Sequence, residues 1–281
     1  MKKTVITIIL IPIIIFIVVN VFASLSSDNN KLALLKEQVT KEHISSADHS
    51  TFEALQKNFK TPQEVTMACQ SCHTERHNEV MNSSHWNWER EEFIKGRGVT
   101  HLGKKNILNN FCIGIGGSEQ SCTRCHAGYN YKDSSFDFTK KENIDCLVCH
   151  DGSGEYYKKT GGAGYPADEV NLTEAAQKVG IPQRSNCGAC HFYGGGGNNV
   201  KHGDLEEAMF ACKKDVDVHM AIDGSDMNCT DCHTTEHHNI TGQMYSVSSM
   251  DKDRVTCEQC HTQTPHSDKI LNEHTVKVAC Q

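Results

Sequence analysis

The sequence has few of the residues that usually build a protein interior. Hydrophobic residues make up only 37% of its 281 positions, and many of them fall in one run near the N-terminus. Proline is scarce, with 5 residues, and the chain has no long low-complexity tract of the kind that indicates disorder. We therefore expect something other than aliphatic side chains to fill the interior: disulfides, metals or a bulky cofactor.

An excess of positive charge is also lacking, because the formal net charge at pH 7 is −7. Proteins that bind nucleic acid usually carry clustered basic residues, so we expect no nucleic-acid partner. The chain also shows no clean repeat of 20–50 residues and no alternating strand pattern. The "GIGG" at 114–117 is not a nucleotide fingerprint, since no strand–helix unit surrounds it.

Cysteine and histidine, in contrast, are abundant, with 15 and 17 residues. Most of the cysteines belong to a Cys-x-x-Cys-His motif that occurs six times at uneven intervals. The six motifs are Cys69, Cys72, His73; Cys122, Cys125, His126; Cys146, Cys149, His150; Cys187, Cys190, His191; Cys229, Cys232, His233; and Cys257, Cys260, His261. This motif is the attachment signature of haem c. Two thiols on one helical turn reach the vinyl groups of one porphyrin, and the adjacent histidine supplies an axial nitrogen to the iron.

Three other uses of cysteine compete with haem attachment: disulfides, zinc binding and thiol redox chemistry. None of them requires a histidine directly after every second cysteine, so the motifs predict covalent haem c. Six porphyrins would also supply the missing apolar interior. We therefore expect a mainly α protein with long loops and little β structure, a multihaem cytochrome c fold organised around stacked covalent haems.

The N-terminus indicates export. Two lysines precede an apolar run at 5–19, so residues 1–25 are predicted to be a signal peptide or an N-terminal membrane anchor. Residues 26–65 are predicted to be a polar, helical lead segment, with helical spacing at Phe52, Leu55 and Phe59. Residues 66–281 are predicted to be the multihaem domain. We expect a periplasmic protein, with possible tethering to the inner membrane through the N-terminus.

Three cysteines lie outside the complete motifs. The final "ACQ" repeats the start of "ACQSCH" at 68–73, so we expect Cys280 to open a seventh attachment site that is cut short. Cys112 and Cys212 then remain. They either form a disulfide with each other or place one thiol beside a reactive iron.

Each iron needs a sixth ligand or an open position for substrate, and eleven histidines lie outside the motifs. A histidine a few residues after its own motif stays on the proximal side of that haem, so it would serve a neighbouring haem. His49, in the polar lead segment, is expected to be solvated. The candidate distal ligands are His85, His101, His202, His219, His238, His266 and His274. Eleven histidines exceed six haems, so the count alone does not require an open iron.

Several long stretches resemble the octahaem tetrathionate reductase cytochromes. They are "NNFCIGI", "CTRCHAGYNYKDSSFDF", "IDCLVCHDGSGEYYKK", "SNCGACHFYGGGGNNVKHGD", "DVHM" and "CTDCHTTEHHNITG", in the family order, and the similarity runs from about residue 47 to the end. The resemblance implies eight haems in the full-length protein. It also implies a periplasmic reductase of small sulfur or nitrogen oxyanions (tetrathionate, nitrite) or hydroxylamine, fed by a quinol-linked donor or a small cytochrome.

The resemblance also implies one catalytic haem among electron-transferring haems with two histidine ligands. That haem belongs to the second motif, with a lysine amine as axial ligand and a cysteine near its open face. The lysine corresponds to Lys201 of "VKHGD" and the cysteine to Cys112 of "NNFC", while Lys104, Lys105, Lys158 and Lys159 remain alternatives for the lysine. A different class of function also stays open: an electron conduit in which every iron has two histidine ligands.

Overall fold

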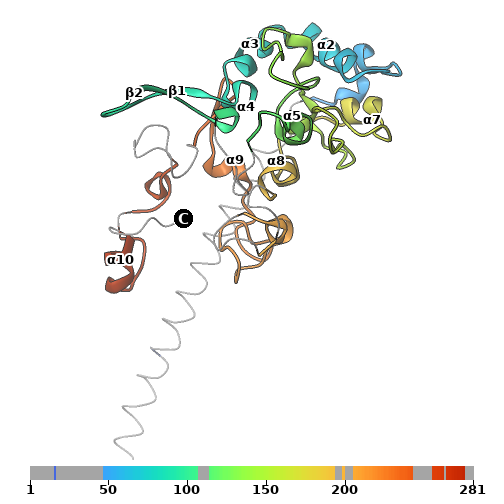
Figure 1. Ribbon diagram of the computed structural model, residues 1–281. Helices are drawn as coiled ribbons and strands as arrows, with labels where there is room; N and C mark the ends of the chain where they lie inside the picture. Colours follow the sequence, from blue (N-terminus) through green and yellow to red (C-terminus); the bar gives the residue numbers. More distant parts are fainter. Residues whose placement is uncertain are drawn as a thin grey trace, which may run out of the picture. The chain divides into compact units, whose positions relative to one another are not determined.

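The computed structural model of the protein describes Phe16 and residues 47–106, 114–193, 198–199, 205–242, 255–262 and 264–275 (Figure 1). These residues form two compact units. Ala208–Asn228 and Phe16 belong to the smaller unit, and the other described residues belong to the larger one. Four predicted site residues lie outside the described residues: Cys112, Lys201, His202 and Cys280. The predicted domain limits at 25 and 65 stay predictions.

Short helices joined by loops make up most of the larger unit. Its α-helices are α2 (Pro62–Cys72), α3 (Arg76–Met81), α4 (Ser84–Asn87), α5 (Glu119–Cys122), α6 (Leu147–His150), α7 (Leu172–Gln177), α8 (Arg184–His191), α9 (Cys229–Cys232) and α10 (Lys269–Thr275). Its 3-10 helices are η1 (His49–Thr51), η2 (Glu53–Leu55), η3 (Lys104–Asn106), η4 (Thr123–Cys125), η5 (Lys141–Asn143) and η8 (Cys257–Gln259). The mainly helical, loop-rich class expected from the sequence is therefore what the structure shows.

Helix α2 is the longest of the described helices and carries the first motif at its C-terminal end. It begins after Thr61, whose hydroxyl accepts a hydrogen bond from the Glu64 amide, and Pro62 occupies the first helical position. The predicted helix around Phe52, Leu55 and Phe59 is instead two 3-10 turns, η1 and η2. Two of its apolar residues still pack inward, because Leu55 and Phe59 are buried.

Two small hydrophobic clusters form the core of the larger unit. One cluster joins η2, α2, α6 and α7 and contains Leu55, Phe59, Val65, Leu147, Ala175 and Ala176. The other contains Trp88, Ile115 and Tyr131, with Phe136 and Phe138 packed against it. Both are small for a unit of this length, which agrees with the shortage of aliphatic residues in the sequence.

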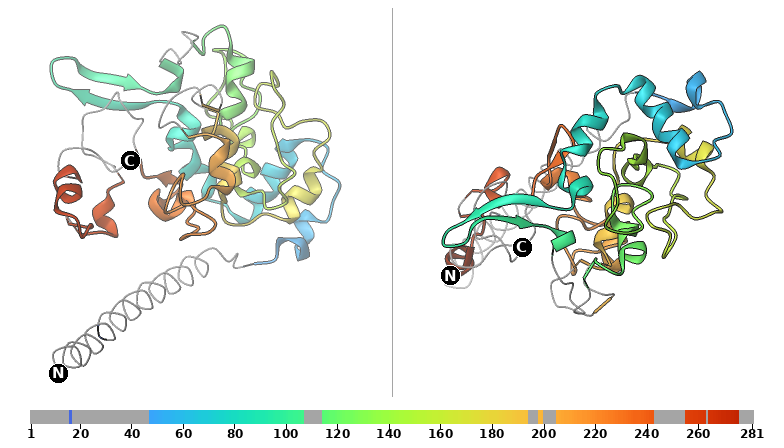
Figure 2. Two further views of the ribbon diagram at one scale, coloured as in Figure 1. Left: turned by 90° about the horizontal axis from the view of Figure 1, so that it is seen from below. Right: turned by 45° about the horizontal axis from the view of Figure 1, so that its top comes forward.

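Strands are few and belong to two antiparallel hairpins. One pairs β1 (Arg90–Ile94) with β2 (Gly98–Leu102), and the other pairs the two-residue strands β3 (Thr235–Glu236) and β4 (Asn239–Ile240). The β1–β2 hairpin extends away from α4 in both Figure 1 and Figure 2. Sequence patterning missed it because Phe93 and Val99, which pair across the strands, are each 63% exposed. A strand with its apolar residues turned to solvent does not show the usual buried alternation.

The smaller unit is built from turns around a buried Cys212 and Ala221. The Ile222 amide donates to the Cys212 carbonyl at 3.0 Å, and the Met227 amide donates to the His219 carbonyl at 2.9 Å. A 3-10 helix, η6 (Glu207–Ala211), lies at the start of this segment of the chain.

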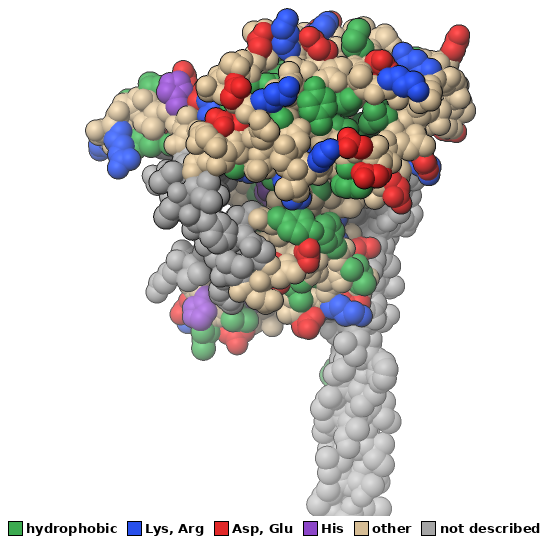
Figure 3. Space-filling model, turned by 45° about the vertical axis from the view of Figure 1, so that its right-hand side comes forward, with side chains coloured by type: hydrophobic (Ala, Val, Ile, Leu, Met, Phe, Trp, Pro, Cys, Tyr) green, Lys and Arg blue, Asp and Glu red, His purple; other side chains and the backbone are tan. Residues whose placement is uncertain are grey.

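Charges of both signs are interspersed on the face of the molecule that Figure 3 shows. This face therefore offers no large field of one sign that would attract an ion over a distance. Among the described residues, no helix has both the length and the apolar character needed to cross a bilayer.

Candidate functional site

Each Cys-x-x-Cys-His motif folds as about one helical turn, which brings its two thiols to the same side. In four motifs the histidine amide closes the turn by donating to the carbonyl of the first cysteine. These bonds are His73 to Cys69 at 2.9 Å, His150 to Cys146 at 3.1 Å, His233 to Cys229 at 2.8 Å and His261 to Cys257 at 2.8 Å. The fourth motif lies entirely within α8. The local geometry expected for attachment of one porphyrin per motif is therefore present.

The second motif departs from this pattern. Helix α5 ends at Cys122, and a 3-10 turn carries the chain through Cys125. The His126 amide donates to the carbonyl of Thr123 instead of Cys122, at 2.9 Å, and His126 itself is extended, with φ −80° and ψ 140°. The backbone therefore turns this imidazole in a different direction from the other motif histidines.

Thiols from different motifs meet in pairs. Hydrogen bonds join Cys69 to Cys146, Cys125 to Cys190, and Cys187 to Cys229. The bond from Cys190 lowers the pKa of the Cys125 thiol to about 6, and the bond from Cys187 lowers the pKa of Cys229 to about 7. No disulfide forms between cysteines in the described part of the chain. The first motif is thus adjacent to the third, and the fourth motif is adjacent to both the second and the fifth.

Three pairs of imidazoles also face each other across the motifs. The ring centroids of His73 and His49 are 6.3 Å apart, those of His150 and His238 are 6.3 Å apart, and those of His191 and His85 are 6.1 Å apart. A metal–imidazole bond is about 2 Å long and the ring centroid lies about 1 Å behind the nitrogen, so two imidazoles on opposite sides of one metal have centroids about 6 Å apart. Each pair therefore has the spacing of two axial ligands of one iron.

Burial lowers the pKa of His150 and so favours its neutral form, which is the protonation state that binds a metal. Burial lowers the pKa of His191 to about 4 and also lowers the pKa of His85. The expectation that His49 is solvated is wrong. Its ring is half-buried, and its Nδ1 atom is buried without a hydrogen-bond partner. The reason is that η1 packs against α7, which folds the polar lead segment onto the body of the larger unit.

In the pair of His150 and His238, the Nδ1 atom of each ring has a hydrogen-bond partner. His150 Nδ1 lies 2.8 Å from the Gly180 carbonyl, and His238 Nδ1 lies 2.8 Å from Glu79 Oε2. Both rings thus have an acceptor at Nδ1, which leaves the Nε2 lone pair for a metal. His238 follows the fifth motif, yet its ring faces the histidine of the third.

His126 of the second motif is enclosed by aromatic rings. Its ring centroid lies 5.0–6.1 Å from the centroids of five aromatic side chains, those of Trp86, Trp88, Tyr131, Phe136 and Phe138. We call these five side chains the aromatic cage. The Nε2 atom of His126, which binds iron in a typical attachment motif, is 2.6 Å from the Trp86 carbonyl. Burial lowers the pKa of His126 to about 3, so the neutral ring donates this hydrogen bond.

A buried lysine lies beside the same motif. The ammonium of Lys158 donates to the carbonyls of His126 and Gly128 and forms an ion pair with Asp145 at 3.0 Å. The Asp145 carboxylate also accepts hydrogen bonds from the hydroxyls of Tyr129 and Tyr156, both at 2.9 Å. Of the four alternative lysines, Lys158 is therefore the one that is buried next to attachment motifs.

The charges of this ion pair act on a neighbouring attachment thiol. Burial raises the pKa of the Cys149 thiol to about 11, and the Asp145 carboxylate adds to this rise. The Lys158 ammonium opposes it. The lysine is thus close enough to influence the third motif as well as the second.

The other alternative lysines have different surroundings. Lys104 lies over the Trp88 ring, 5.1 Å from its centroid. Lys105 and Lys159 form ion pairs with Glu89 and Asp168, at 2.8 and 2.6 Å.

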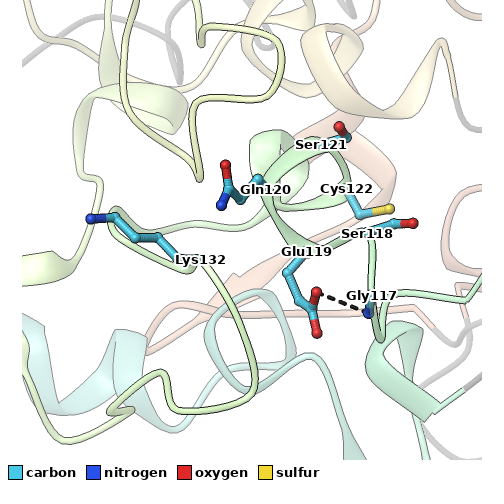
Figure 4. Close-up of a pocket in the computed structure, with 7 residues that line it drawn as sticks. All are labelled: Gly117, Ser118, Glu119, Gln120, Ser121, Cys122 and Lys132. Atoms are coloured by element: carbon cyan, nitrogen blue, oxygen red, sulfur yellow. Dashed lines mark hydrogen bonds between the residues drawn. The ribbon is translucent and has the colours of Figure 1, made fainter.

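A cavity of about 510 Å³ opens next to the second motif (Figure 4). It is lined by Cys122 and the preceding residues 117–121, together with Lys132. Figure 4 shows the Lys132 side chain directed away from the Cys122 sulfur.

The remaining predicted distal ligands lie elsewhere. His101 is on β2, 54% exposed and 3.9 Å from Glu91. His266 and His274 are exposed near α10, and His219 belongs to the smaller unit. Sequence reasoning missed His49, Asp145 and the aromatic cage. The dense aromatics of "HWNW" and "YNYKDSSFDF" were the available signal for the cage.

The attachment residues fit covalent haem. The motifs supply paired thiols on single helical turns, and three motif histidines have a second imidazole at the spacing of a shared metal. The buried Nδ1 atoms of His49 and His77 have no hydrogen-bond partner in the structure. Buried polar atoms of this kind call for a bound group that completes their surroundings.

Comparison with known proteins points to the same chemistry. An octahaem cytochrome c from Shewanella oneidensis, solved by crystallography, is 47% identical, with a TM-score of 0.75 over 84% of this chain. The chain spans about half, 52%, of that protein's length. An uncharacterized protein of Archaeoglobus fulgidus is 26% identical in an alignment of 247 positions that covers 70% of this chain and 81% of that protein. No protein-family model matches the chain. The structural likeness supports the interpretation of the chain as a multihaem cytochrome c with a redox or electron-transfer role.

Proposed function

We propose that the protein is an exported multihaem c-type cytochrome that reduces a small sulfur or nitrogen substrate at the haem of its second motif. The six motifs, their helical turns and the likeness to an octahaem cytochrome c support covalent haem attachment. Haem bound there supplies one-electron redox chemistry, and an iron with a replaceable ligand also offers a place for a substrate.

Most of the described residues around the motifs serve electron transfer. The imidazole pairs of His49 with His73, His85 with His191, and His238 with His150 would each hold one iron between the two rings. A site with both axial positions filled by histidine transfers electrons and does not bind substrate. The contacts between thiols of different motifs support this role, because a chain of short electron transfers requires neighbouring sites.

We place the proposed reaction at the second motif because its histidine is withdrawn, which means that its Nε2 atom already has a hydrogen-bond partner. His126 Nε2 donates to the Trp86 carbonyl inside the aromatic cage, so this nitrogen is not available to iron. We propose that the amine of Lys158, which is buried beside the His126 and Gly128 carbonyls, would bind the iron in place of His126. We prefer Lys158 to Lys201 because Lys158 is buried beside the second motif, whereas the carry-over to Lys201 rests on the family resemblance alone. The withdrawal of His126 is the single observation on which the proposal rests most.

Asp145 and its neighbours prepare Lys158 for this role. A buried amine must lose a proton before it binds a metal, and Asp145 Oδ2, at 3.0 Å, is in position to hold or receive that proton. The hydroxyls of Tyr129 and Tyr156 hold Asp145 in place. The aromatic cage keeps water away from His126, which stabilises its withdrawn position.

The substrate class and electron donor follow from the family resemblance. Tetrathionate, nitrite and hydroxylamine are the proposed substrates, and a quinol-linked enzyme or a small cytochrome is the proposed donor. The net charge of −7 does not attract an anion, so attraction must be local. Cys112 lies near the open face in the resemblance, and we propose that its thiolate attacks a central sulfur of tetrathionate. The central S–S bond breaks, one thiosulfate leaves, and the other half of the substrate stays bonded to the cysteine sulfur.

A pure electron conduit is the second candidate. The three imidazole pairs favour it, because an iron held between two imidazoles would have no position left for a substrate. The two candidates differ at the haem of the second motif. A reductase needs that haem to be open to substrate, and a pure electron conduit needs it to be closed.

The test replaces Lys158 by methionine in the haem-loaded, exported protein, with Lys159→Met as the matched control. Lys159 is adjacent in sequence but pairs with Asp168 at the surface, where both side chains are more than half exposed. We expect Lys158→Met to change the electron paramagnetic resonance signal of one haem and to lower turnover of tetrathionate, nitrite and hydroxylamine at least about 100-fold. If the spectrum and turnover of Lys158→Met match those of the control, Lys158 is not the ligand. If the unmodified protein shows only low-spin signals that cyanide and nitrite leave unchanged, the conduit is the correct function.

A further inference from the structure

A carboxylate on α3 contacts two consecutive histidines of the β3–β4 turn. Glu79 Oε2 lies 2.8 Å from His238 Nδ1, and Glu79 Oε1 lies 3.3 Å from His237 Nδ1. The Arg76 guanidinium contacts the same Oε1 atom. The Glu79 side chain is only 17% exposed, although it carries a charge. Such a carboxylate is held in place by its partners and restricts the movement of the rings that it touches.

The turn that presents these histidines is unusual for their residue type. His237 and His238 are the two central residues between β3 and β4, and both are left-handed, with φ of 48° and 60°. Two-residue hairpin turns with two positive φ angles favour Asn-Gly, because larger side chains are disfavoured there. The contacts to Glu79 offset the cost of this backbone conformation and fix the direction of both rings.

The outer face of His238 is thus fixed while its inner face points to the third motif. The His238 and His150 ring centroids are 6.3 Å apart, and His150 has its own acceptor at Nδ1, the Gly180 carbonyl. The two acceptors differ in charge: one is a neutral carbonyl and the other a carboxylate. A carboxylate at Nδ1–H makes an imidazole a more basic ligand than a carbonyl does.

We propose that Glu79 is a positioning residue that orients His238 toward the iron of the third motif and lowers the reduction potential of that haem. The inference rests on the proposed function, because it takes His150 and His238 as the two ligands of one site. A more basic imidazole stabilises the ferric state more than the ferrous state, so loss of the carboxylate raises the potential.

The test compares Glu79→Gln with Glu75→Gln in the haem-loaded protein. Both variants remove one negative charge from the same segment of the chain. Glu75 lies directly before α3, where its carboxylate accepts a hydrogen bond from the Asn78 side chain, at 3.0 Å. His238→Ala first identifies the resonance signal of the third-motif haem, which loses a ligand and becomes high-spin.

We expect Glu79→Gln to raise the midpoint potential of that signal and to shift its g values, while Glu75→Gln leaves both unchanged. The expected change in the reduction equilibrium is about tenfold, which corresponds to about 59 mV for a one-electron couple. As a second variant, His237→Gly relieves one left-handed residue and keeps the Glu79–His238 contact, so the potential should stay as in the unmodified protein.

The role of Glu79 and the pairing of His150 with His238 can fail separately. Equal potentials in Glu79→Gln and Glu75→Gln, with the haem count unchanged, overturn the role of Glu79 alone. If His238→Ala leaves every haem low-spin, the pairing of His150 with His238 fails, and with it this part of the proposed function.

Discussion

The Lys158 ammonium lies 3.0 Å from the Asp145 carboxylate, and the two side chains are only 4% and 0% exposed. Asp145 directly precedes the third motif, while Lys158 donates to the His126 carbonyl of the second. The ion pair therefore connects two attachment sites through buried charges. Isolated buried charges are costly, so such a pair persists only where both members have further hydrogen bonds, as these two have.

Removal of one charge from this pair should destabilise the protein strongly. Asp145→Asn removes the carboxylate that takes the proton of Lys158 and holds the Tyr129 and Tyr156 hydroxyls. A proton that stays on Lys158 then has no counter-charge, and we expect a loss of about 3–5 kcal/mol in the free energy of unfolding. Asp168→Asn is the control, because Asp168 is 80% exposed and its ion pair with Lys159 contributes at most about 1 kcal/mol. Urea denaturation of the haem-loaded protein measures both. Equal midpoints for the two variants would show that the buried pair contributes little.

The aromatic cage depends on a glycine. A Cβ atom on Gly128 would lie 2.6 Å from the Trp86 ring, 2.9 Å from the Asn143 carbonyl and 2.9 Å from the His126 ring. We expect Gly128→Ala to lower the free energy of unfolding by about 1–3 kcal/mol, because the backbone carbonyl cannot move aside easily. Gly116→Ala is the matched control, since nothing lies within 4 Å of a Cβ there. A stability of Gly128→Ala equal to that of the control would mean that the packing around His126 is loose.

His49 provides a test of a ligand that the sequence did not reveal. If His49 and His73 share one iron, His49→Ala should convert one haem from low-spin to high-spin without changing the number of attached haems. His101→Ala serves as the comparison, because His101 is 54% exposed on β2. Electron paramagnetic resonance of the two oxidised variants is the measurement. A His49 variant that stays entirely low-spin would remove His49 from the ligand set.

The helical turns of the attachment motifs could be predicted from the sequence because they depend on local spacing. Two cysteines three residues apart with a following histidine need only one helical turn, and each motif forms one. The distal ligands depend on contacts between distant segments, so periodicity and composition do not identify them. His85 meets His191 across more than 100 residues, and His238 meets His150 across 88 positions of sequence.

The burial of Lys158 likewise could not be predicted from the sequence. Lys158 and Lys159 are neighbours in sequence, yet one is buried beside Asp145 and the other is exposed beside Asp168. Local pattern does not distinguish them, because burial follows from the fold of the 145–166 region against Gly128. The isolated bridges Gly128 to Ile144 and Lys158 to Pro166 bring these segments together.

The account depends most directly on covalent haem at the Cys-x-x-Cys-His motifs. Intact mass spectrometry of the exported protein under denaturing conditions tests this, because thioether bonds survive denaturation and axial ligation does not. We predict the mass of the polypeptide plus one haem for each of the six complete motifs, and one haem fewer when Cys122 and Cys125 are both replaced by serine. A mass equal to the bare polypeptide, after maturation in a host that attaches haem c, would contradict the account.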